Sequence, residues 1–584
     1  MPESLTTLTI LPPAWVSRLD AAWQRLGGSA WLQRLWARDA GLWASTPAEA
    51  KAIQGRLGWL SILPVMESAA EDLTAFAKQV KQAGFTHAVL LGMGGSSLFP
   101  EVCRNIFGAA PGWLDLHILD TTDPTAIAQA RQRLPLERTL VIVSSKSGTT
   151  IEPNALCQYF YEQLRQIRGA SAGEQCVAIT DAGSPLEAQA LRMGFRRVFA
   201  HGPATGAEVG GRFSALTSFG LVPAALLGVD LRRLLSRARA MLENSQDDRP
   251  LAEKSAVQLG LALGEGAASG RDKVTLVCPP HVAALGAWIE QLVAESTGKI
   301  GKGLIPICGE PLRPPEAYGA DRLFIEVQRL DRPDRALDEP LRALAQAGHP
   351  VMQLRWDDAY DLGGETMRWF IATVLAGAMM RLNPFDEPDV QESKDRTKAL
   401  LQQYARGQTL PSQEPPLLTD GTITVVGDRA RFKGATLPEL LCDMFQQVSP
   451  KDYLAILSFL PRSASLERQV IALRERLAAG TGAATIVSHG PRYLHSLGQL
   501  YKGGPDQGVL VCLTCDEPDD LPIPGQPYTF GALKHAQAVG DVQALTDRRR
   551  RVLHLHLGSQ PEGDLARLLN AVEQAVKMAQ GSQR

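Results

Sequence analysis

Two short stretches rich in glycine and hydroxyl groups could bind a phosphate. Residues 92–97 read GMGGSS and residues 145–150 read SKSGTT, and each follows an apolar run and precedes a helical pattern. Glycine lets the backbone approach a ligand closely, and the free N–H groups of a helix start favour an anion. The stretches contain no Walker A pattern, so a nucleoside triphosphate is not indicated, and the first does not match GxGxxG. Two such stretches at equivalent strand ends favour a monophosphate. The alternative is that these residues only cap helices.

Three polar side chains further along the chain could move protons or stabilise charge. Gln291 and Glu295 are four residues apart, so they share one face of a helix, and Gly298 is suited to end that helix. A carboxylate at a helix C-terminus tends to have a raised pKa, which suits a general base. Arg212, which follows two glycines, could stabilise an oxyanion. Considered alone, these residues are better explained by an exposed helix end and an exposed turn.

Most of the chain alternates between apolar runs and helical patterns, which is typical of βαβ units around parallel sheets. The runs expected to form strands are residues 86–93, 114–120, 139–145, 176–181, 195–200, 273–280, 323–328 and 351–356. Five more follow a proline-rich stretch near residue 411. Ligands bind at the carboxyl ends of the strands in such sheets, and both hydroxyl-rich stretches lie at strand ends.

These patterns divide the chain into five parts. We predict a helical N-terminal segment over residues 1–60, a first α/β domain over 61–240 and a second over 241–405. A linker over 406–421 contains three prolines and leads to a third α/β domain over 422–584. A chain of 584 residues is too long for one hydrophobic core, which agrees with this division.

The composition argues against several classes of protein. The net charge is −2, and the one basic run, residues 548–551, leads into an apolar strand, so we expect no nucleic-acid partner. No apolar stretch is long enough for a membrane helix, and the N-terminus lacks the features of a signal peptide. The eight cysteines are scattered, and the one CxxC, Cys512 and Cys515, lies in an expected buried strand. We therefore expect a cytoplasmic protein with no membrane partner and no metal site.

Five motifs connect these residues in a known order. GMGGSSL, SSKSGTT, GGRFSALTSFGL, QLVAESTGK and NPFDEPDVQESK occur in the order found in glucose-6-phosphate isomerases, and the chain resembles that family over roughly residues 90–400. The resemblance implies an α/β fold of tandem sugar-isomerase (SIS) domains, each a three-layer α/β/α sandwich with a mainly parallel sheet. It also implies that the substrates are glucose 6-phosphate and fructose 6-phosphate, and that neither a cofactor nor a metal takes part.

The two ends of the chain resemble a narrower group. RLWARDAGLW, GPRYLHSLGQLYKGGPDQGV and PYTFGALKHAQAVGD are similar to the isomerase portion of bacterial transaldolase–isomerase fusion proteins. A transaldolase needs a (β/α)8 barrel of at least about 200 residues, and residues 1–60 are too few to form one. The third, C-terminal α/β domain lies outside ordinary members of the isomerase family.

The resemblance implies a role for each matching residue. Glu295 matches the base that carries a proton between C1 and C2 through a cis-enediolate, and Arg212 matches the residue that stabilises this intermediate. Lys394 matches a lysine near the sugar ring oxygen. The positions expected to bind the substrate are Gly94, Gly95, Ser96, Ser145, Lys146, Ser147, Thr149, Thr150, Gly211 and Gln291.

The histidine that opens the sugar ring in this family has no clear match. The family carries it on a loop between the glutamate and lysine motifs, where His349 is the only histidine, and His349 is offset from the expected position. His495 is the other candidate, in a polar run that resembles a segment of related sugar-phosphate isomerase domains. The sequence leaves both open, and either could be a structural histidine.

Two other functions remain open on the sequence. A bifunctional phosphoglucose/phosphomannose isomerase would be distinguished by the pocket around Thr297. A non-catalytic sugar-phosphate sensor would keep the phosphate loops, lose the base and carry a DNA-binding helix-turn-helix. Glu295 is present, and the sequence has no evident basic recognition helix. Members of the family share site residues across a homodimer; this chain could do so too, or its third domain could supply those contacts.

Overall fold

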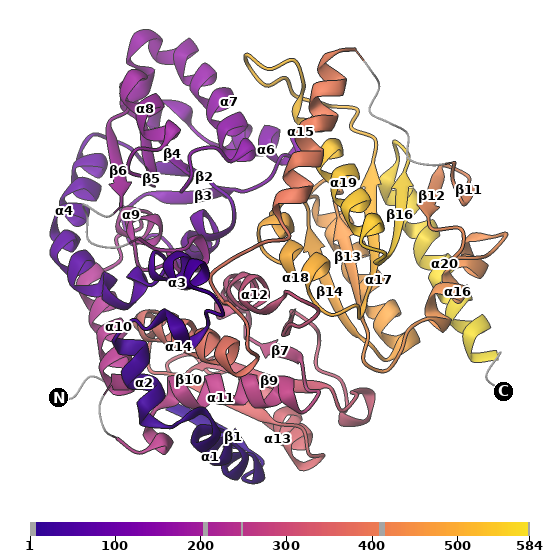
Figure 1. The fold of residues 1–584 in the computed structure, drawn as a ribbon. Helices are drawn as coiled ribbons and strands as arrows, with labels where there is room; N and C mark the ends of the chain where they lie inside the picture. The colour runs from indigo at the N-terminus through magenta and orange to yellow at the C-terminus, as the bar shows by residue number, and fades with distance from the viewer. Residues whose placement is uncertain (1–6, 203–207, 247–248, 408–414, 582–584) are drawn as a thin grey trace.

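A computed structural model of the protein describes residues 7–202, 208–246, 249–407 and 415–581. They form three mainly parallel β-sheets, and Figure 1 shows helices on both faces of each, so that every sheet is the middle layer of an α/β/α sandwich. In that view the first sheet lies at the upper left, the second below it and the third at the right. The first six residues, and residues 408–414 of the predicted linker, lie outside the described part of the chain.

The first sheet carries both predicted phosphate loops at its carboxyl edge. Its parallel strands are β2 (His87–Leu91), β3 (Asp115–Leu119), β4 (Thr139–Ser144), β5 (Cys176–Asp181) and β6 (Arg197–His201), in the order β3-β2-β4-β5-β6. The surrounding helices are α4 (Ile62–Gln82), α5 (Leu98–Phe107), α6 (Pro124–Arg133), α7 (Ile151–Arg168), α8 (Pro185–Arg192), α9 (Ser218–Leu226) and α10 (Leu231–Gln246).

Alternate residues of β2 pack into different hydrophobic clusters. Ala88 and Leu90 lie in the cluster that contains α4, α5 and α9, whereas Val89 and Leu91 lie in the cluster with α6, α7 and α8. Successive side chains of a strand point to opposite faces of the sheet, so both faces are covered. A strand buried on both faces is apolar throughout, which is why these strands could be predicted from apolar runs.

The second sheet has the order β1-β10-β9-β7-β8. Its strands are β7 (Lys273–Val277), β8 (Ile305–Cys308), β9 (Arg322–Arg329), β10 (Val351–Trp356) and, antiparallel at one edge, β1 (Thr7–Leu11). Its helices are α1 (Ala14–Leu26), α2 (Ser29–Trp36), α3 (Pro47–Gln54), α11 (Ser255–Ala268), α12 (Ala284–Thr297), α13 (Asp338–Gln346) and α14 (Leu362–Met379). The helix that follows, α15 (Gln391–Ala405), packs against α19 (Phe530–Asp547) instead.

Two strands of the second sheet differ from the prediction. The sequence predicts a helical segment over residues 1–60, and α1 to α3 are helices, but Thr7–Leu11 pairs with β10 as an edge strand. β8, at the opposite edge, is not predicted at all, and it contains Pro306. A proline lacks the N–H that a central strand must donate, but an edge strand tolerates it.

The third sheet has the order β11-β12-β16-β15-β13-β14. Its strands are β11 (Leu418–Asp420), β12 (Ile423–Gly427), β13 (Tyr453–Ser458), β14 (Ala484–His489), β15 (Gly508–Cys515) and β16 (Arg551–Leu557). β13 to β16 are parallel, and β11 and β12 are antiparallel additions. The helices are α16 (Leu437–Gln446), α17 (Ala464–Thr481), α18 (Gly498–Gly503), α19 (Phe530–Asp547) and α20 (Pro561–Gly581).

Four strands that are consecutive along the chain follow the same spatial order in each sheet. They read β3-β2-β4-β5, β8-β7-β9-β10 and β14-β13-β15-β16, so the second strand along the chain always lies on one side of the first, and the third and fourth lie on the other. Open α/β sheets bind ligands where the connections diverge, between the first and third strands. In the first sheet this point lies between β2 and β4, where the two predicted phosphate loops begin.

The third sheet and its helices form a unit that packs against both of the others. Leu533 of α19 shares a hydrophobic cluster with Phe160 of α7. Tyr453 of β13 shares another with Ala294 of α12. Figure 1 shows α15 standing between the first unit and the third, where it runs along α19.

Contacts between the first and third units are reciprocal. His495, in the loop after β14, contacts Glu152 of α7, the helix that follows the third strand of the first sheet. In turn Asp123, in the loop after β3, contacts Lys534 of α19, the helix that follows the third strand of the third sheet. Each unit therefore presents the loop after its second strand to the other unit's helix after the third strand. This is the contact pattern of a two-fold interface, formed here within one chain.

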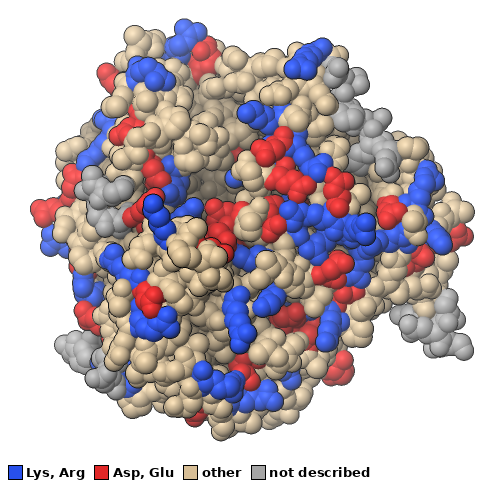
Figure 2. All heavy atoms as spheres, viewed as in Figure 1, with Lys and Arg blue, Asp and Glu red and all other residues tan. Residues whose placement is uncertain are grey.

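Charged residues are mixed by sign on the face shown in Figure 2. Two arginines of the basic run 548–551 pair with carboxylates of the molecule: Arg548 donates hydrogen bonds to Asp389 and Glu392, and Arg551 donates to Asp452. Within the described residues, no helix is both long enough and apolar enough to cross a membrane.

Candidate active site

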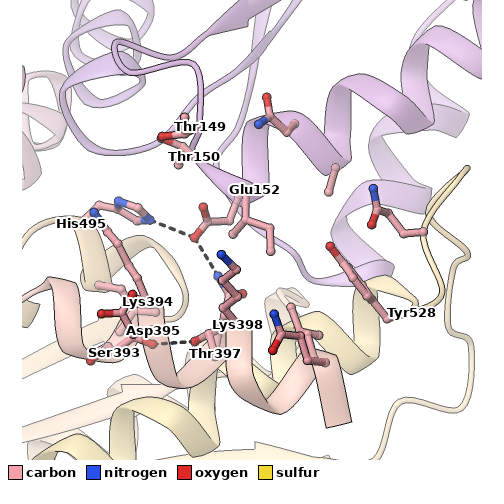
Figure 3. A pocket seen from close by; sticks show the side chains of 18 of the residues that line it. Thr149, Thr150, Glu152, Ser393, Lys394, Asp395, Thr397, Lys398, His495 and Tyr528 are labelled. Atoms are coloured by element: carbon pink, nitrogen blue, oxygen red, sulfur yellow. Dashed lines mark hydrogen bonds and ion pairs between the residues drawn. The ribbon is translucent and has the colours of Figure 1, made fainter. Parts of the chain in front are cut away.

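A cavity of about 740 Å³ opens between the first unit, α15 and the third unit. Ser147, Thr149 and Thr150 line it from the loop after β4, Lys394 lines it from α15, and His495 lines it from the loop after β14 (Figure 3). The structure therefore brings part of a predicted phosphate loop, the predicted lysine and one of the two candidate histidines to one cavity. These residues come from distant parts of the chain.

The loop after β4 is held by hydrogen bonds among its own side chains. Oγ of Ser145 donates to Oγ1 of Thr150 at 3.3 Å, and the hydroxyls of Ser147 and Thr149 lie 2.9 Å apart. Nζ of Lys146 lies 2.5 Å from Oδ2 of an aspartate on β5. Ser147 and Thr149 are exposed and available to a ligand, whereas Ser145 is buried and Lys146 is engaged by an ion pair.

The loop after β2 packs against the turn that carries Arg212. A Cβ atom on Gly95 would lie 2.0 Å from the carbonyl oxygen of Gly211, so only glycine fits there. Gly94 has a φ of +54°, and a Cβ atom on it would lie 2.7 Å from Nε2 of Gln291. The glycines of this loop thus allow protein segments to approach one another closely. Ser96 of the same loop is buried.

Glu295 lies in the last turn of α12, and its side chain is 11% exposed. Its Oε2 atom lies 3.3 Å from Nε2 of Gln291 and 3.6 Å from Nη1 of Arg212. Burial raises the pKa of Glu295 to about 7, Arg212 opposes that rise, and Glu387 adds to it. The sequence argument attributes a raised pKa to the helix end, but burial is the larger cause. A carboxylate with this pKa can take and return a proton at neutral pH.

The end of α12 is fixed by the third unit. The helix stops at Thr297 as predicted, but Gly298 has a φ of −79° and does not adopt the left-handed conformation of a typical glycine cap. A Cβ atom on Gly298 would instead lie 2.6 Å from Cα of Leu500 in α18. Glycine is required here because α18 approaches the helix closely.

Arg212 is buried, with 4% of its surface exposed, rather than lying in an exposed turn. Its side chain donates to Oγ of Ser296 (2.9 Å), Oε2 of Glu387 (2.9 Å) and the carbonyl oxygens of Pro384 (2.7 Å) and Asp386 (2.9 Å). These bonds fix the plane of the guanidinium beside Glu295. A preorganised cation at this position stabilises negative charge that develops next to the carboxylate.

His495 connects the cavity with Glu295. Its Nε2 atom lies 2.9 Å from Oε1 of Glu152, and its carbonyl oxygen accepts a hydrogen bond of 2.9 Å from Gln291. Gln537 of α19 donates to the same Oε1 atom of Glu152 at 2.7 Å. Burial alone would raise the pKa of Glu152, but His495, a backbone hydrogen bond and the charge of Lys394 together hold this pKa below its usual value. Glu152 therefore presents a charged carboxylate that orients the imidazole.

His349 lies in a different environment. It precedes β10, and its ring centroid lies 5.6 Å from that of Phe324 and 6.2 Å from that of Tyr318. Burial lowers the pKa of His349. Among the described residues, those that line the cavity do not include His349. The structure brings His495, and not His349, to this cavity.

Glu295 does not face the cavity directly. Glu295, Gln291 and Arg212 are not among the described residues that line the cavity. Gln291 bridges the two places, because its amide nitrogen donates both to Glu295 and to the carbonyl of His495. A ligand anchored on the loop after β4 would therefore reach Glu295 past His495.

Two carboxylates of the site were not predicted from the sequence. Glu152 closely follows the SKSGTT stretch, in the first turn of a helix, where an acidic residue is common for helix stability alone. Glu387 lies in the irregular NPFDEP segment, which has no periodic pattern to indicate what it contacts. The position of Glu152 beside the predicted phosphate loop could have indicated that it belongs to the site. For Glu387, only the tertiary fold shows that it lies at the site.

The cysteines and acidic groups form no evident metal site. In the part of the chain that the structure describes, no cluster of three or more His, Cys, Asp or Glu side chains is arranged to hold a metal ion. Cys512 and Cys515 are buried in β15 as the sequence predicts, and burial raises the pKa of the Cys515 thiol to about 12. A thiol with so high a pKa is protonated and inert at neutral pH.

Part of the chain matches a known family. Residues 64–302 match the family model described as phosphoglucose isomerase. A protein of Synechococcus sp. (strain JA-3-3Ab) named glucose-6-phosphate isomerase is 29% identical over 391 residues, which cover 58% of this chain and 72% of that protein. A second, from Synechococcus sp. (strain JA-2-3B'a(2-13)), is 37% identical over 222 residues, which cover 37% and 40% of the two chains. The matched range of the chain includes Arg212 and Glu295, and it ends before Lys394 and His495.

Solved structures share the fold. A hypothetical protein of Thermus thermophilus is 25% identical with a TM-score of 0.57, and the similarity covers 67% of this chain and 99% of that one. A glucose-6-phosphate isomerase of Chlamydia trachomatis is 18% identical with a TM-score of 0.54, covering 68% and 89%. The predicted fold of sandwiches with mainly parallel sheets is confirmed.

Proposed function

We propose that this chain interconverts glucose 6-phosphate and fructose 6-phosphate, because residues 64–302 match the family model described as phosphoglucose isomerase. The observation that carries the proposal is the buried Glu295, whose pKa is about 7, beside the Arg212 guanidinium. An aldose–ketose isomerisation needs a base that takes a proton from one carbon and returns it to the next. A single carboxylate next to a fixed positive charge meets this need.

In the proposed reaction Glu295 removes the proton from C2 of the open-chain aldose. The electrons of the C–H bond form the C1–C2 double bond, and the aldehyde oxygen takes the negative charge of a cis-enediolate. Arg212 stabilises that charge. Protonated Glu295 then gives its proton to C1, and the proton of the C2 hydroxyl moves to the C1 oxygen, so that C2 becomes the ketone and C1 carries a hydroxyl. Nothing is oxidised or reduced overall.

Ring opening is assigned to His495. Its imidazole lines the cavity and is oriented by Glu152, so it can transfer a proton between the C1 hydroxyl and the ring oxygen. Lys394 lines the same cavity from α15 and can stabilise the charge on the ring oxygen. Contacts with site residues favour His495 over His349 for this role.

The 6-phosphate is assigned to the loop after β4. Ser147, Thr149 and Thr150 offer hydroxyl groups at the start of α7, where free backbone N–H groups also favour an anion. The same cavity carries the positive charge of Lys394. A phosphate bound there lies at the carboxyl end of β4, as expected for an open α/β sheet.

The first test is a coupled assay of fructose 6-phosphate conversion to glucose 6-phosphate, with chelator present. We expect an active wild type and a loss of at least about 10²–10⁴-fold in kcat for Glu295→Gln, because glutamine cannot accept the proton. Glu71→Gln is the matched control, since Glu71 is 82% exposed on α4 and pairs with Arg232. Its activity should equal that of the wild type.

An inactive wild type would refute the proposed reaction and direct attention to other sugar phosphates. Activity retained in Glu295→Gln would refute the assignment of the base. Mannose 6-phosphate is assayed in parallel, because its conversion would identify the broader phosphoglucose/phosphomannose activity.

A further inference from the structure

Glu387 competes with Glu295 for the same arginine. Nη1 of Arg212 lies 2.9 Å from Oε2 of Glu387 and 3.6 Å from Oε2 of Glu295. The shorter contact is a hydrogen bond, and the longer one is an ion pair without one. Arg212 therefore interacts with two carboxylates, and its contact with Glu387 is the shorter one.

The remaining donors of Arg212 cannot turn towards Glu295. Nε is engaged by Ser296, and Nη2 is engaged by the carbonyl oxygens of two residues in the segment 384–386. The guanidinium is rigid and planar, so these bonds fix the direction of Nη1 as well. The geometry of the pair thus depends on where the segment that carries Glu387 is held.

That segment is held by a second cation. Nζ of Lys299 lies 2.7 Å from Oδ1 of Asp386 and donates to the carbonyl oxygens of Asn383 (2.7 Å) and Asp386 (2.6 Å). Arg56 approaches the other oxygen of Glu387 at 3.9 Å. Glu387 is consequently fixed between Arg212 and Arg56 while its side chain remains 34% exposed.

The charged groups that face Glu295 come from every element packed against it. They are Arg212 from the turn before α9, Glu387 from the segment before α15, Lys299 from the end of α12 and His495 from the third unit. Of these, Glu387 is the one negative group, and it raises the pKa of Glu295 while the three basic groups lower it. Without Glu387, the leading charges that act on Glu295 would all be basic.

We propose that Glu387 is a positioning residue that draws the charge of Arg212 away from Glu295 and so keeps Glu295 a strong enough base for isomerisation. The inference rests on the proposed role of Glu295. A carboxylate paired directly with an arginine is a weak base, because the pairing stabilises its ionised form. Arg212 remains beside the reacting atoms, available for the negative charge of the enediolate.

The test is the pH profile of kcat/KM for wild type and Glu387→Gln. Glutamine keeps an oxygen that can accept the hydrogen bond from Arg212, but it removes the negative charge. In the wild type, kcat/KM should fall below about pH 7 as Glu295 becomes protonated. In Glu387→Gln this acidic limb should move to lower pH by roughly one unit, and kcat on the plateau should fall a few-fold.

A second measurement does not depend on turnover. The ¹³C carboxyl signal of Glu295, assigned by its absence in Glu295→Gln, reports the titration of this group directly. It should shift to lower pH in Glu387→Gln, return part of the way in Glu387→Asp, and stay unchanged in Glu71→Gln. An unchanged or upward-shifted titration in Glu387→Gln overturns the inference, even in a variant that has lost all activity. An inactive wild type with the expected titration shift refutes the proposed reaction and leaves the role of Glu387 intact.

Discussion

Glu152 links residues from three separate segments. It lies in the first turn of α7, just after the loop proposed to bind phosphate, it accepts a hydrogen bond from Gln537 of α19, and it contacts His495. Its side chain is nearly fully buried, and a buried charge is stable only when it is paired. The position of His495 is therefore tied to the same helix that begins at the phosphate loop.

Replacing His495 by glutamine tests the assignment of ring opening. Glutamine can hydrogen-bond to Glu152 but cannot transfer a proton, so we expect kcat for cyclic fructose 6-phosphate to fall by about 10²–10⁴-fold. An open-chain analogue that cannot form a ring should be bound with unchanged affinity, measured by inhibition of the residual activity. A comparable loss in His349→Gln, with His495→Gln active, would transfer the role to His349.

At the scale of elements, the site depends on how closely its loops approach. The loop after β2 and the turn that carries Arg212 touch through backbone atoms alone at Gly95 and Gly211. The helix α12 is buried along most of its length, and it presents Gln291, Glu295 and Ser296 to these two loops. Small changes in the spacing of these elements therefore move the arginine relative to the base.

Gly95→Ala is the substitution that tests this spacing. The added Cβ atom would lie 2.0 Å from the carbonyl oxygen of Gly211, so one of the two loops must shift. We expect a lower melting temperature, a loss of stability of about 1–3 kcal/mol and a fall in kcat/KM. Gly211→Ala is the matched comparison for stability, since nothing lies within 4 Å of its added carbon. Equal melting temperatures for the two variants would contradict the close contact.

The elements were partly predictable from the sequence. Strands such as β2 and β4 are buried on both faces, so they appear as continuous apolar runs followed by a glycine- and hydroxyl-rich loop. β1 and β8 are short edge strands, and β8 contains Pro306, so their patterns are weak. Gln291 and Glu295 could be paired because four residues complete one helical turn. The contacts of His495 and Glu387 with the other site residues could not be predicted, because packing between distant parts of the chain creates them.

At the scale of the whole molecule, the third unit supplies a residue that completes the site. His495 comes from the loop after β14, and its carbonyl oxygen and side chain contact residues of the second and first units. The shared hydrophobic clusters and the reciprocal contacts hold this unit against both others. All the residues that we assign to the reaction therefore meet within a single chain.

This arrangement predicts an active monomer. Sedimentation of the full chain should give one species near 63.1 kDa, and specific activity should not change on dilution. The physical reason is that joining the units covalently makes their association intramolecular and independent of concentration. Activity that falls on dilution, together with a dimer that dissociates over the same range, would show that a second chain is required.

The reciprocal contacts between the first and third units also bear on how this protein can change. In a symmetric homodimer one gene encodes both sides of the interface, so each substitution appears twice, and both copies must tolerate it. Here the two sides are encoded by separate stretches of one gene and can diverge independently. They already differ: one side pairs His495 with Glu152, whereas the other pairs Lys534 with Asp123. A substitution of Lys534 or Asp123 can therefore alter the lysine side while the pair of His495 and Glu152 stays the same.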